Sequence, residues 1–137
     1  MTHSLDTNVF IELIRNRNLN VRRNFEKALH DEHLVGSLIV VHELHYGADR
    51  HPRPDEEREA IRRTMVGVEV APFDEGDMIA TARVRADLAK RGRTIGAYDL
   101  LIAGQALARG WTVVTANTHE FARIDGLNVI DWTAPAD

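Results

Sequence analysis

The sequence predicts an α/β fold, namely a single-domain α/β/α sandwich with a central parallel sheet. Short apolar segments of strand length alternate along the whole chain with longer segments whose apolar residues recur at helical spacing. Because the helices that connect parallel strands cover both faces of the sheet, this alternation favours a three-layer arrangement. The length of 137 residues suits one domain and is too short for two ordinary ones, so we expect a single domain over residues 1–137.

The first half of the chain is expected to supply two strands and four helices. After the strand at 3–5, the segment Asp6–Asn8 can cap a helix whose apolar residues are spaced for one face. Ser37 can cap another helix, and Gly47 with the prolines at 52 and 54 ends it. The predicted elements are a strand at 3–5, a helix after 6–8, a helix at 20–30, a strand at 34–37, a helix from 37 to about 48, and a helix from 55 to about 65.

The second half of the chain is expected to supply three strands and two helices. Gly92 and Gly110 mark the ends of the helices, and the small residues Ala103, Gly104 and Ala106 allow the second helix to pack closely. The predicted elements are a strand at 68–71, a helix at 74–90, a loop at 91–94, a helix at 96–109, a strand at 111–115 and a strand at 127–130.

Three acidic residues, Asp6, Glu43 and Asp99, lie on the apolar side of predicted helix starts. Glu43, for example, shares a helix face with Ile39 and Val40. Burial of one unpaired carboxylate costs several kcal/mol or forces it to take up a proton. Repetition of the pattern at three separated points therefore indicates one shared partner, and a divalent cation is the simplest one.

These acids are expected to converge on one edge of the sheet. Asp6 follows the first strand directly and Glu43 lies just after the second, while the strand beginning at 111 is followed by Thr115, Asn117 and Glu120. In open parallel sheets, ligands bind outside the carboxyl ends of the strands. Asp99 would reach this edge from the start of its helix.

The expected chemistry is hydrolysis of a phosphodiester bond by a metal-activated water. Mg²⁺ and Mn²⁺ prefer oxygen ligands and commonly bind a few carboxylates together with the phosphate of the substrate. Such an ion can lower the pKa of a water and neutralise charge on the leaving oxygen. The chain has no cysteine, so thiolate zinc sites and disulfides are excluded. His42 and His45 are three residues apart, whereas the zinc-protease helix requires a spacing of four.

Each acid also has a purely structural interpretation. Asp6 could be only a helix cap, and Asp99 only a first-turn acid favoured by the helix dipole. Glu43 could form a buried ion pair with an arginine, and Glu120 could be a surface residue beside Phe121.

Composition limits the class of protein and its partners. No apolar run approaches the roughly 20 residues that cross a bilayer, and the N-terminus lacks a secretory signal, so we expect no membrane association and a cytoplasmic location. The net charge of −4 argues against binding to nucleic acid through the overall field. Arginines gather at 15–23 and 83–93, and they are either solvated helix faces or a local path for phosphate.

Four segments, taken together, resemble the PIN-domain family and, more narrowly, the VapC toxins of bacterial toxin–antitoxin pairs. They occur in the order and at the spacing typical of the family and cover nearly the whole chain. The segments are Leu5-Asp-Thr-Asn-Val9, Val41-His-Glu-Leu-His-Tyr-Gly47, Ile95-Gly-Ala-Tyr-Asp-Leu-Leu-Ile-Ala103, and Val114-Thr-Ala-Asn-Thr-His-Glu-Phe121 followed by Gly126-Leu-Asn-Val-Ile-Asp-Trp132.

The resemblance implies an endoribonuclease that depends on Mg²⁺ or Mn²⁺ and cuts a structured RNA of translation, a tRNA or an rRNA. Asp6, Glu43 and Asp99 match the strongest acidic positions and would hold the metal. Family members often have an Asp near the position of Asn117, so Glu120 is expected to complete the acidic set. The supporting residues are expected to be Asn8, Thr115 and Asn117.

The resemblance also implies protein partners, namely a VapB-type antitoxin that covers the active-site groove and inhibits the toxin, and a second toxin chain in a homodimer. Two other functions can be compared with this one. The first, a phosphoacceptor receiver domain, is disfavoured, because it would need an Asp after the middle strand and a Lys after a late strand, and neither is present. A binding module would use the acids for a structural ion and act with its antitoxin on operator DNA.

Overall fold

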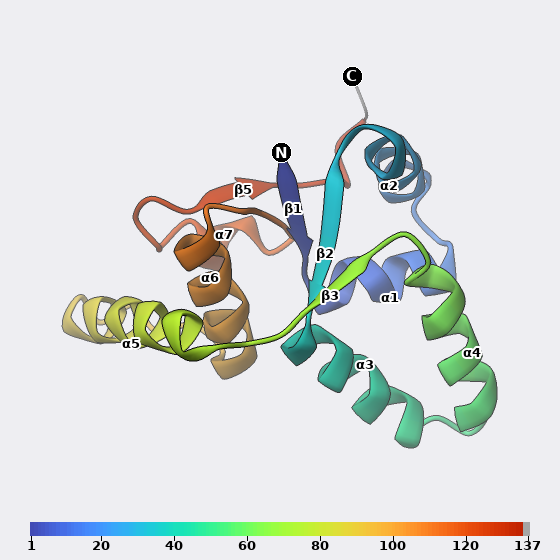
Figure 1. The fold of residues 1–137 in the computed structure, drawn as a ribbon, viewed down its shortest axis with the longest axis horizontal. Coiled ribbons are helices and arrows are strands. Elements are labelled where there is room, and N and C mark those ends of the chain that lie inside the picture. The colour runs from blue at the N-terminus through green and yellow to red at the C-terminus, as the bar shows by residue number, and fades with distance from the viewer. Residues whose placement is uncertain (136–137) are drawn as a thin grey trace.

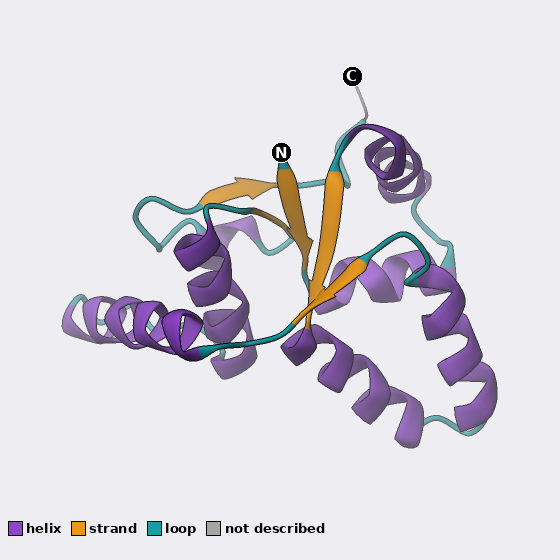
Figure 2. Ribbon diagram, viewed as in Figure 1, coloured by secondary structure: helices purple, strands orange, loops and turns teal. Residues whose placement is uncertain are grey.

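A computed structural model describes residues 1–135, and these form a five-stranded parallel sheet with helices on both faces (Figures 1 and 2). All neighbouring strands pair in parallel, in the order β3-β2-β1-β4-β5. The strands are β1 (Thr2–Leu5), β2 (His33–Ser37), β3 (Glu69–Ala71), β4 (Thr112–Val114) and β5 (Asn128–Ile130). The predicted fold class is confirmed.

Seven helices in residues 1–135 connect and cover these strands. Figure 1 shows α1 to α4 on one side of the sheet and α5 to α7 on the other. The helices are α1 (Thr7–Arg15), α2 (Leu19–Asp31), α3 (Leu38–Asp49), α4 (Pro54–Thr64), α5 (Glu75–Lys90), α6 (Ala97–Arg109) and α7 (Thr118–Phe121). The sheet therefore forms the middle layer of a sandwich.

Consecutive residues of β4 show how the sheet contributes to two cores. Val114 packs in a cluster with side chains of α1 to α4, whereas Val113 packs in a second cluster with side chains of α5 to α7. Both valines are fully buried. Because successive side chains of a strand point to opposite faces, one short apolar strand can contribute to both layers.

Helices α5 and α6 approach each other closely at Gly104. A Cβ atom at this position would lie 2.7 Å from the Cα of Thr81. Near the C-terminal end of α6, Arg109 forms a salt bridge of 2.8 Å with the buried Asp77 of α5, and Gln105 donates to the same carboxylate over 3.2 Å. These contacts fix the orientation of α6, whose first turn carries Asp99.

The predicted strands and the six longer helices are present, with ends shifted by a residue or two. Pro54 begins α4 instead of belonging only to the break before it, because proline fits the first turn of a helix. The short helix α7 was not expected. Among residues 1–135, no helix combines the length and the hydrophobicity of a transmembrane segment. The single domain over 1–137 stays a prediction, and its last two residues lie outside the described part.

Candidate active site

The site lies where the chain changes direction across the sheet. From β1 the chain continues to β2 and β3 on one side, whereas β4 and β5 lie on the other, so β1 and β4 are neighbours at a topological switch point. The backbone N–H of Asp6 donates to the carbonyl of Val114 over 3.0 Å, which fixes the first acid at the end of both strands. Ligand sites of open α/β sheets form at such points.

Asp6 is both the N-cap of α1 and a buried acid. One carboxylate oxygen accepts a hydrogen bond of 2.9 Å from the backbone N–H of Val9, and only 3% of the residue is exposed. Burial raises the pKa of Asp6 to about 6; hydrogen bonds from Thr115 and Val9 oppose the rise, and the charges of Asp99 and Glu43 add to it. The capping interpretation is therefore correct, but it does not account for a buried acid that faces other acids.

Glu43 projects from α3 and is anchored by the first residue of α1. The hydroxyl of Thr7 donates to one oxygen of Glu43 over 2.6 Å. Within residues 1–135, no Lys, Arg or His forms a salt bridge with Glu43. The alternative of a buried ion pair with an arginine thus finds no partner in the described structure.

Asp99 lies in the first turn of α6 and is half-buried. Burial raises the pKa of Asp99, and the negative charges of Glu120 and then Glu43 raise it further, while a hydrogen bond from Asn117 lowers it. A first-turn position favours an acid through the helix dipole. The neighbouring carboxylates have the opposite effect, so the site favours a compensating positive charge.

Asp6, Glu43 and Asp99 line one pocket of about 670 Å³ together with Asn8. The other lining residues are Thr7, Ile11, His42, Tyr46 and Tyr98. No lysine or arginine is among them. Two arginines of the cluster at 15–23 are engaged elsewhere, because Arg15 pairs with Glu57 at 2.8 Å and Arg17 with Glu12 at 3.0 Å.

Three further candidates, Thr115, Asn117 and Glu120, lie behind the acids and do not line the pocket. Thr115 and Asn117 contact Asp6 and Asp99, respectively, through side-chain hydrogen bonds. The backbone N–H of Asn117 donates to the Thr115 hydroxyl over 2.9 Å, and its side-chain amide donates to Glu120. Glu120 is half-buried on α7, so it is neither a lining residue nor a free surface acid.

The donor set fits a hard divalent cation, although the side chains do not form a closed metal centre. Among residues 1–135, no three His, Asp or Glu side chains lie close enough to hold one ion as they are placed. At least one carboxylate would therefore have to rotate on binding. Oxygen ligands without a neighbouring Lys or Arg suit Mg²⁺ or Mn²⁺.

A model of the PIN domain family matches residues 4–127. The chain belongs to the PIN-domain family. This PIN domain is 38% identical over 128 residues to the tRNA(fMet)-specific endonuclease VapC of Salmonella typhimurium, covering 93% of this chain and 96% of the relative. It is 36% identical over 129 residues to the protein of that name from Shigella flexneri, covering 94% and 96%, respectively.

The fold of this PIN domain also matches one chain of a solved VapBC structure. The crystal structure of DNA-bound VapBC from Salmonella typhimurium superimposes with a TM-score of 0.90 at 36% identity, covering 96% of this chain and 98% of the solved chain. Identity of this size over nearly the full length places the PIN domain among the VapC ribonuclease toxins.

Sequence reasoning missed the aromatic side chains and the threonine in the pocket of the PIN domain. Thr7, His42 and Tyr98 are each adjacent in sequence to one of the three acids, and Tyr46 lies one helical turn after Glu43. Adjacency to an acid was the available signal, but it does not reveal which side chains turn toward the pocket. His42 and His45 are exposed on α3.

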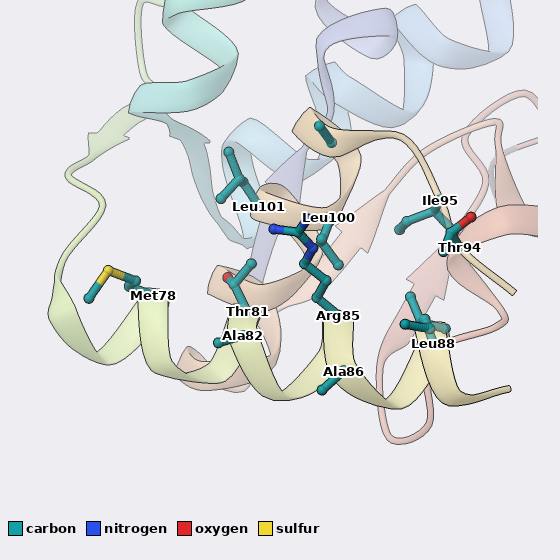
Figure 3. A pocket seen from close by; sticks show the side chains of 12 residues that line it. Met78, Thr81, Ala82, Arg85, Ala86, Leu88, Thr94, Ile95, Leu100 and Leu101 are labelled. Carbon is teal, nitrogen blue, oxygen red and sulfur yellow. The ribbon is translucent and has the colours of Figure 1, made fainter. Parts of the chain in front are cut away.

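A larger pocket of about 780 Å³ lies between α5 and α6 of the PIN domain (Figure 3). Its walls are mainly apolar, and Figure 3 shows the Arg85 side chain extending from α5 toward α6. None of its lining residues is acidic or a histidine. This pocket therefore lacks ligands for a hard cation and is not the candidate active site.

Proposed function

We propose that this VapC-family PIN domain is an endoribonuclease that depends on Mg²⁺ or Mn²⁺. The observation that carries the proposal is the pocket in which Asp6, Glu43 and Asp99 meet from three separate elements without a lysine or arginine in its lining. Burial and mutual repulsion raise the pKa of Asp6 and of Asp99. A divalent cation would relieve that repulsion.

Asp6, Glu43 and Asp99 would hold the ion. When bound, Mg²⁺ or Mn²⁺ would supply an activated water nucleophile and neutralise the charge that develops when a phosphodiester bond is hydrolysed. Thr7 holds the Glu43 carboxylate through its hydroxyl, and Val9 holds Asp6 through its backbone N–H. These bonds leave the remaining carboxylate oxygens to face the pocket as ligands.

Glu120, Thr115 and Asn117 would act behind these ligands. Thr115 and Asn117 orient Asp6 and Asp99 through hydrogen bonds. The charge of Glu120 acts on Asp99 and would increase the affinity of the site for a cation. Asn8 lines the pocket and can donate hydrogen bonds to the substrate.

The substrate would be a structured RNA of the translation machinery, a tRNA or an rRNA. Two relatives that match nearly the whole chain are named tRNA(fMet)-specific endonucleases, which makes tRNA(fMet) the first substrate to test. The partner would be a VapB-type antitoxin that inhibits the toxin in the cytoplasm, since solved relatives include VapBC complexes. A toxin homodimer within that larger complex is part of the proposal.

Cleavage of a tRNA(fMet) transcript by antitoxin-free protein tests the assignment of Asp99. In the presence of Mg²⁺ or Mn²⁺, Asp99→Asn should abolish cleavage with little effect on folding, because shape is kept while a ligand charge is lost. Asp125→Asn is the matched control, since Asp125 is an exposed acid far along the chain from the pocket residues. An active Asp99→Asn protein would contradict the assignment.

A further inference from the structure

Aromatic side chains stand at the active-site pocket on the same two helices that carry Glu43 and Asp99. His42 and Tyr46 belong to α3, and Tyr98 belongs to α6. All three line the pocket. Tyr46 is 56% exposed and Tyr98 is 47% exposed, so both rings present much of their surface to solvent. Large exposed rings beside a polar site are suited to bind a ligand that has a flat face.

Two of the three rings lie close together, and the third carries a cation near its face. The rings of His42 and Tyr98 are 5.8 Å apart between centroids and tilted by 47°, which bridges α3 and α6 across the pocket. The guanidinium of Arg50 lies 5.5 Å from the centroid of the Tyr46 ring. Because His42 and Tyr46 are four residues apart in α3, they share a helix face and form one edge of the pocket.

The charge of the pocket indicates what this aromatic edge can bind. Three carboxylates and no lysine or arginine line the cavity. Contacts between phosphate and basic side chains therefore cannot hold RNA inside it, and the carboxylates repel an acidic ligand. Stacking of a neutral base on an aromatic ring needs no positive charge and works with every base, since each has a π-face.

We propose that Tyr98 and Tyr46, with His42 beside them, form a stacking site for an unpaired nucleobase next to the bond that is cut. Proteins that recognise RNA by sequence commonly splay unstacked bases onto aromatic side chains. The stacking site would restrict cleavage to single-stranded nucleotides, such as those of a loop, because a base inside a helix cannot reach the rings. Arg50 would stabilise the flanking phosphate at the rim. This inference rests on the proposed nuclease function, since it assigns the base that adjoins the reacting phosphate.

The test measures binding of a fluorescent single-stranded oligoadenylate of about eight nucleotides to the full-length Asp6→Asn protein in Mg²⁺. The same RNA with abasic nucleotides serves as the second probe. Tyr98→Leu in this background should weaken binding of the oligoadenylate by about 5- to 150-fold, whereas Tyr98→Phe, which keeps the ring, should stay within about twofold. Abasic RNA should bind weakly to all three proteins, with no further loss from Tyr98→Leu.

Leu38→Ala is the matched control, because Leu38 is an exposed apolar residue of α3 outside the pocket. It should leave both affinities unchanged, and circular dichroism checks that each variant is folded. The inference is wrong if the Asp6→Asn protein binds oligoadenylate no better than abasic RNA, or if Tyr98→Leu binds oligoadenylate as tightly as Tyr98→Phe does. The inference is also overturned if Tyr98→Leu weakens binding of the antitoxin but leaves binding of oligoadenylate unchanged, because the rings would then form a protein-docking surface.

The outcomes separate this inference from the proposed function. Base-dependent binding that is lost in Tyr98→Leu supports the stacking site even if the protein with native Asp6 cleaves no RNA, in which case the nuclease proposal fails alone. Metal-dependent cleavage by the native protein, with oligoadenylate binding that does not depend on Tyr98, supports the nuclease and overturns the stacking site.

Discussion

Asp6 combines two functions that are usually found in different residues. As the N-cap of α1 it accepts from the backbone of Val9, and as a pocket residue it stays almost fully buried beside two other acids. Capping favours Asp and Asn about equally. Only the second function requires the negative charge, so the two can be separated by Asp6→Asn.

Asp6→Asn should stabilise the metal-free protein at neutral pH. The pKa of Asp6 is about 6 in the folded state and near 3.8 without the protein environment, so the folded state retains this proton longer than the unfolded state does. Wild-type stability therefore falls as the pH rises from about 4 to about 6, by at most about 3 kcal/mol. Urea unfolding in EDTA should show the variant more stable at about pH 7.5 and equal to wild type below about pH 4. Parallel stability curves over this range would contradict the burial of an uncompensated acid.

Thr7→Val should lower the affinity of the site for a metal ion. Within residues 1–135, Thr7 is the only residue whose hydroxyl donates a hydrogen bond to Glu43. The hydrogen bond is 2.6 Å long and joins α1 to α3. Loss of a residue that orients a metal ligand typically lowers metal affinity or activity by about 10- to 100-fold. Titration with Mn²⁺ followed by calorimetry measures the effect, and Thr64→Val, which removes a hydroxyl that bonds within α4, is the control. Equal Mn²⁺ affinities in wild type and Thr7→Val would exclude Thr7 from this role.

At the scale of elements, the sequence predicted what depends on long periodic patterns. The six longer helices have at least nine residues each, and several have a recognisable cap or stop, such as Ser37 at α3 or Gly110 after α6. Helix α7 has four residues and no side-chain cap, and a period of 3.6 cannot be recognised in so short a segment. The position of Glu120 was therefore the least predictable of the four acids.

Gly104→Ala should destabilise the protein, because the contact between α5 and α6 leaves no space for a Cβ atom. The added atom would lie 2.7 Å from the Cα of Thr81, so backbone must move. Overpacking of this kind typically costs about 1–3 kcal/mol. Gly47→Ala is the control, because a Cβ at Gly47 in α3 meets nothing within 4 Å and should stabilise the helix by up to about 1 kcal/mol. Chemical denaturation of both variants measures the two effects, and an unchanged Gly104→Ala protein would show that the helices can separate freely.

At the scale of the whole molecule, the place where the acids gather was predictable, because topology determines the edge of the sheet at which β1 and β4 end. Residues that follow parallel strands meet at one edge, which places Asp6 beside Thr115 whatever the side chains do. The aromatic edge of the pocket was not predictable, since the positions of Tyr46 and Tyr98 depend on how α3 and α6 pack across the sheet. Sequence gives the order of elements but not the angle between two helices.

Metal-dependent cleavage of RNA by purified, antitoxin-free protein is the decisive experiment for the proposed nuclease and its metal. Total cellular RNA is incubated with Mg²⁺ or Mn²⁺, with EDTA in a parallel sample, and with Asp6→Asn protein as the matched control. We expect one or a few discrete fragments that require both the metal and native Asp6, and end mapping of a fragment would place the cut in an unpaired loop. Equal cleavage in EDTA, or by the Asp6→Asn protein, would contradict the proposal, as would a folded, metal-loaded native protein that leaves all RNA intact.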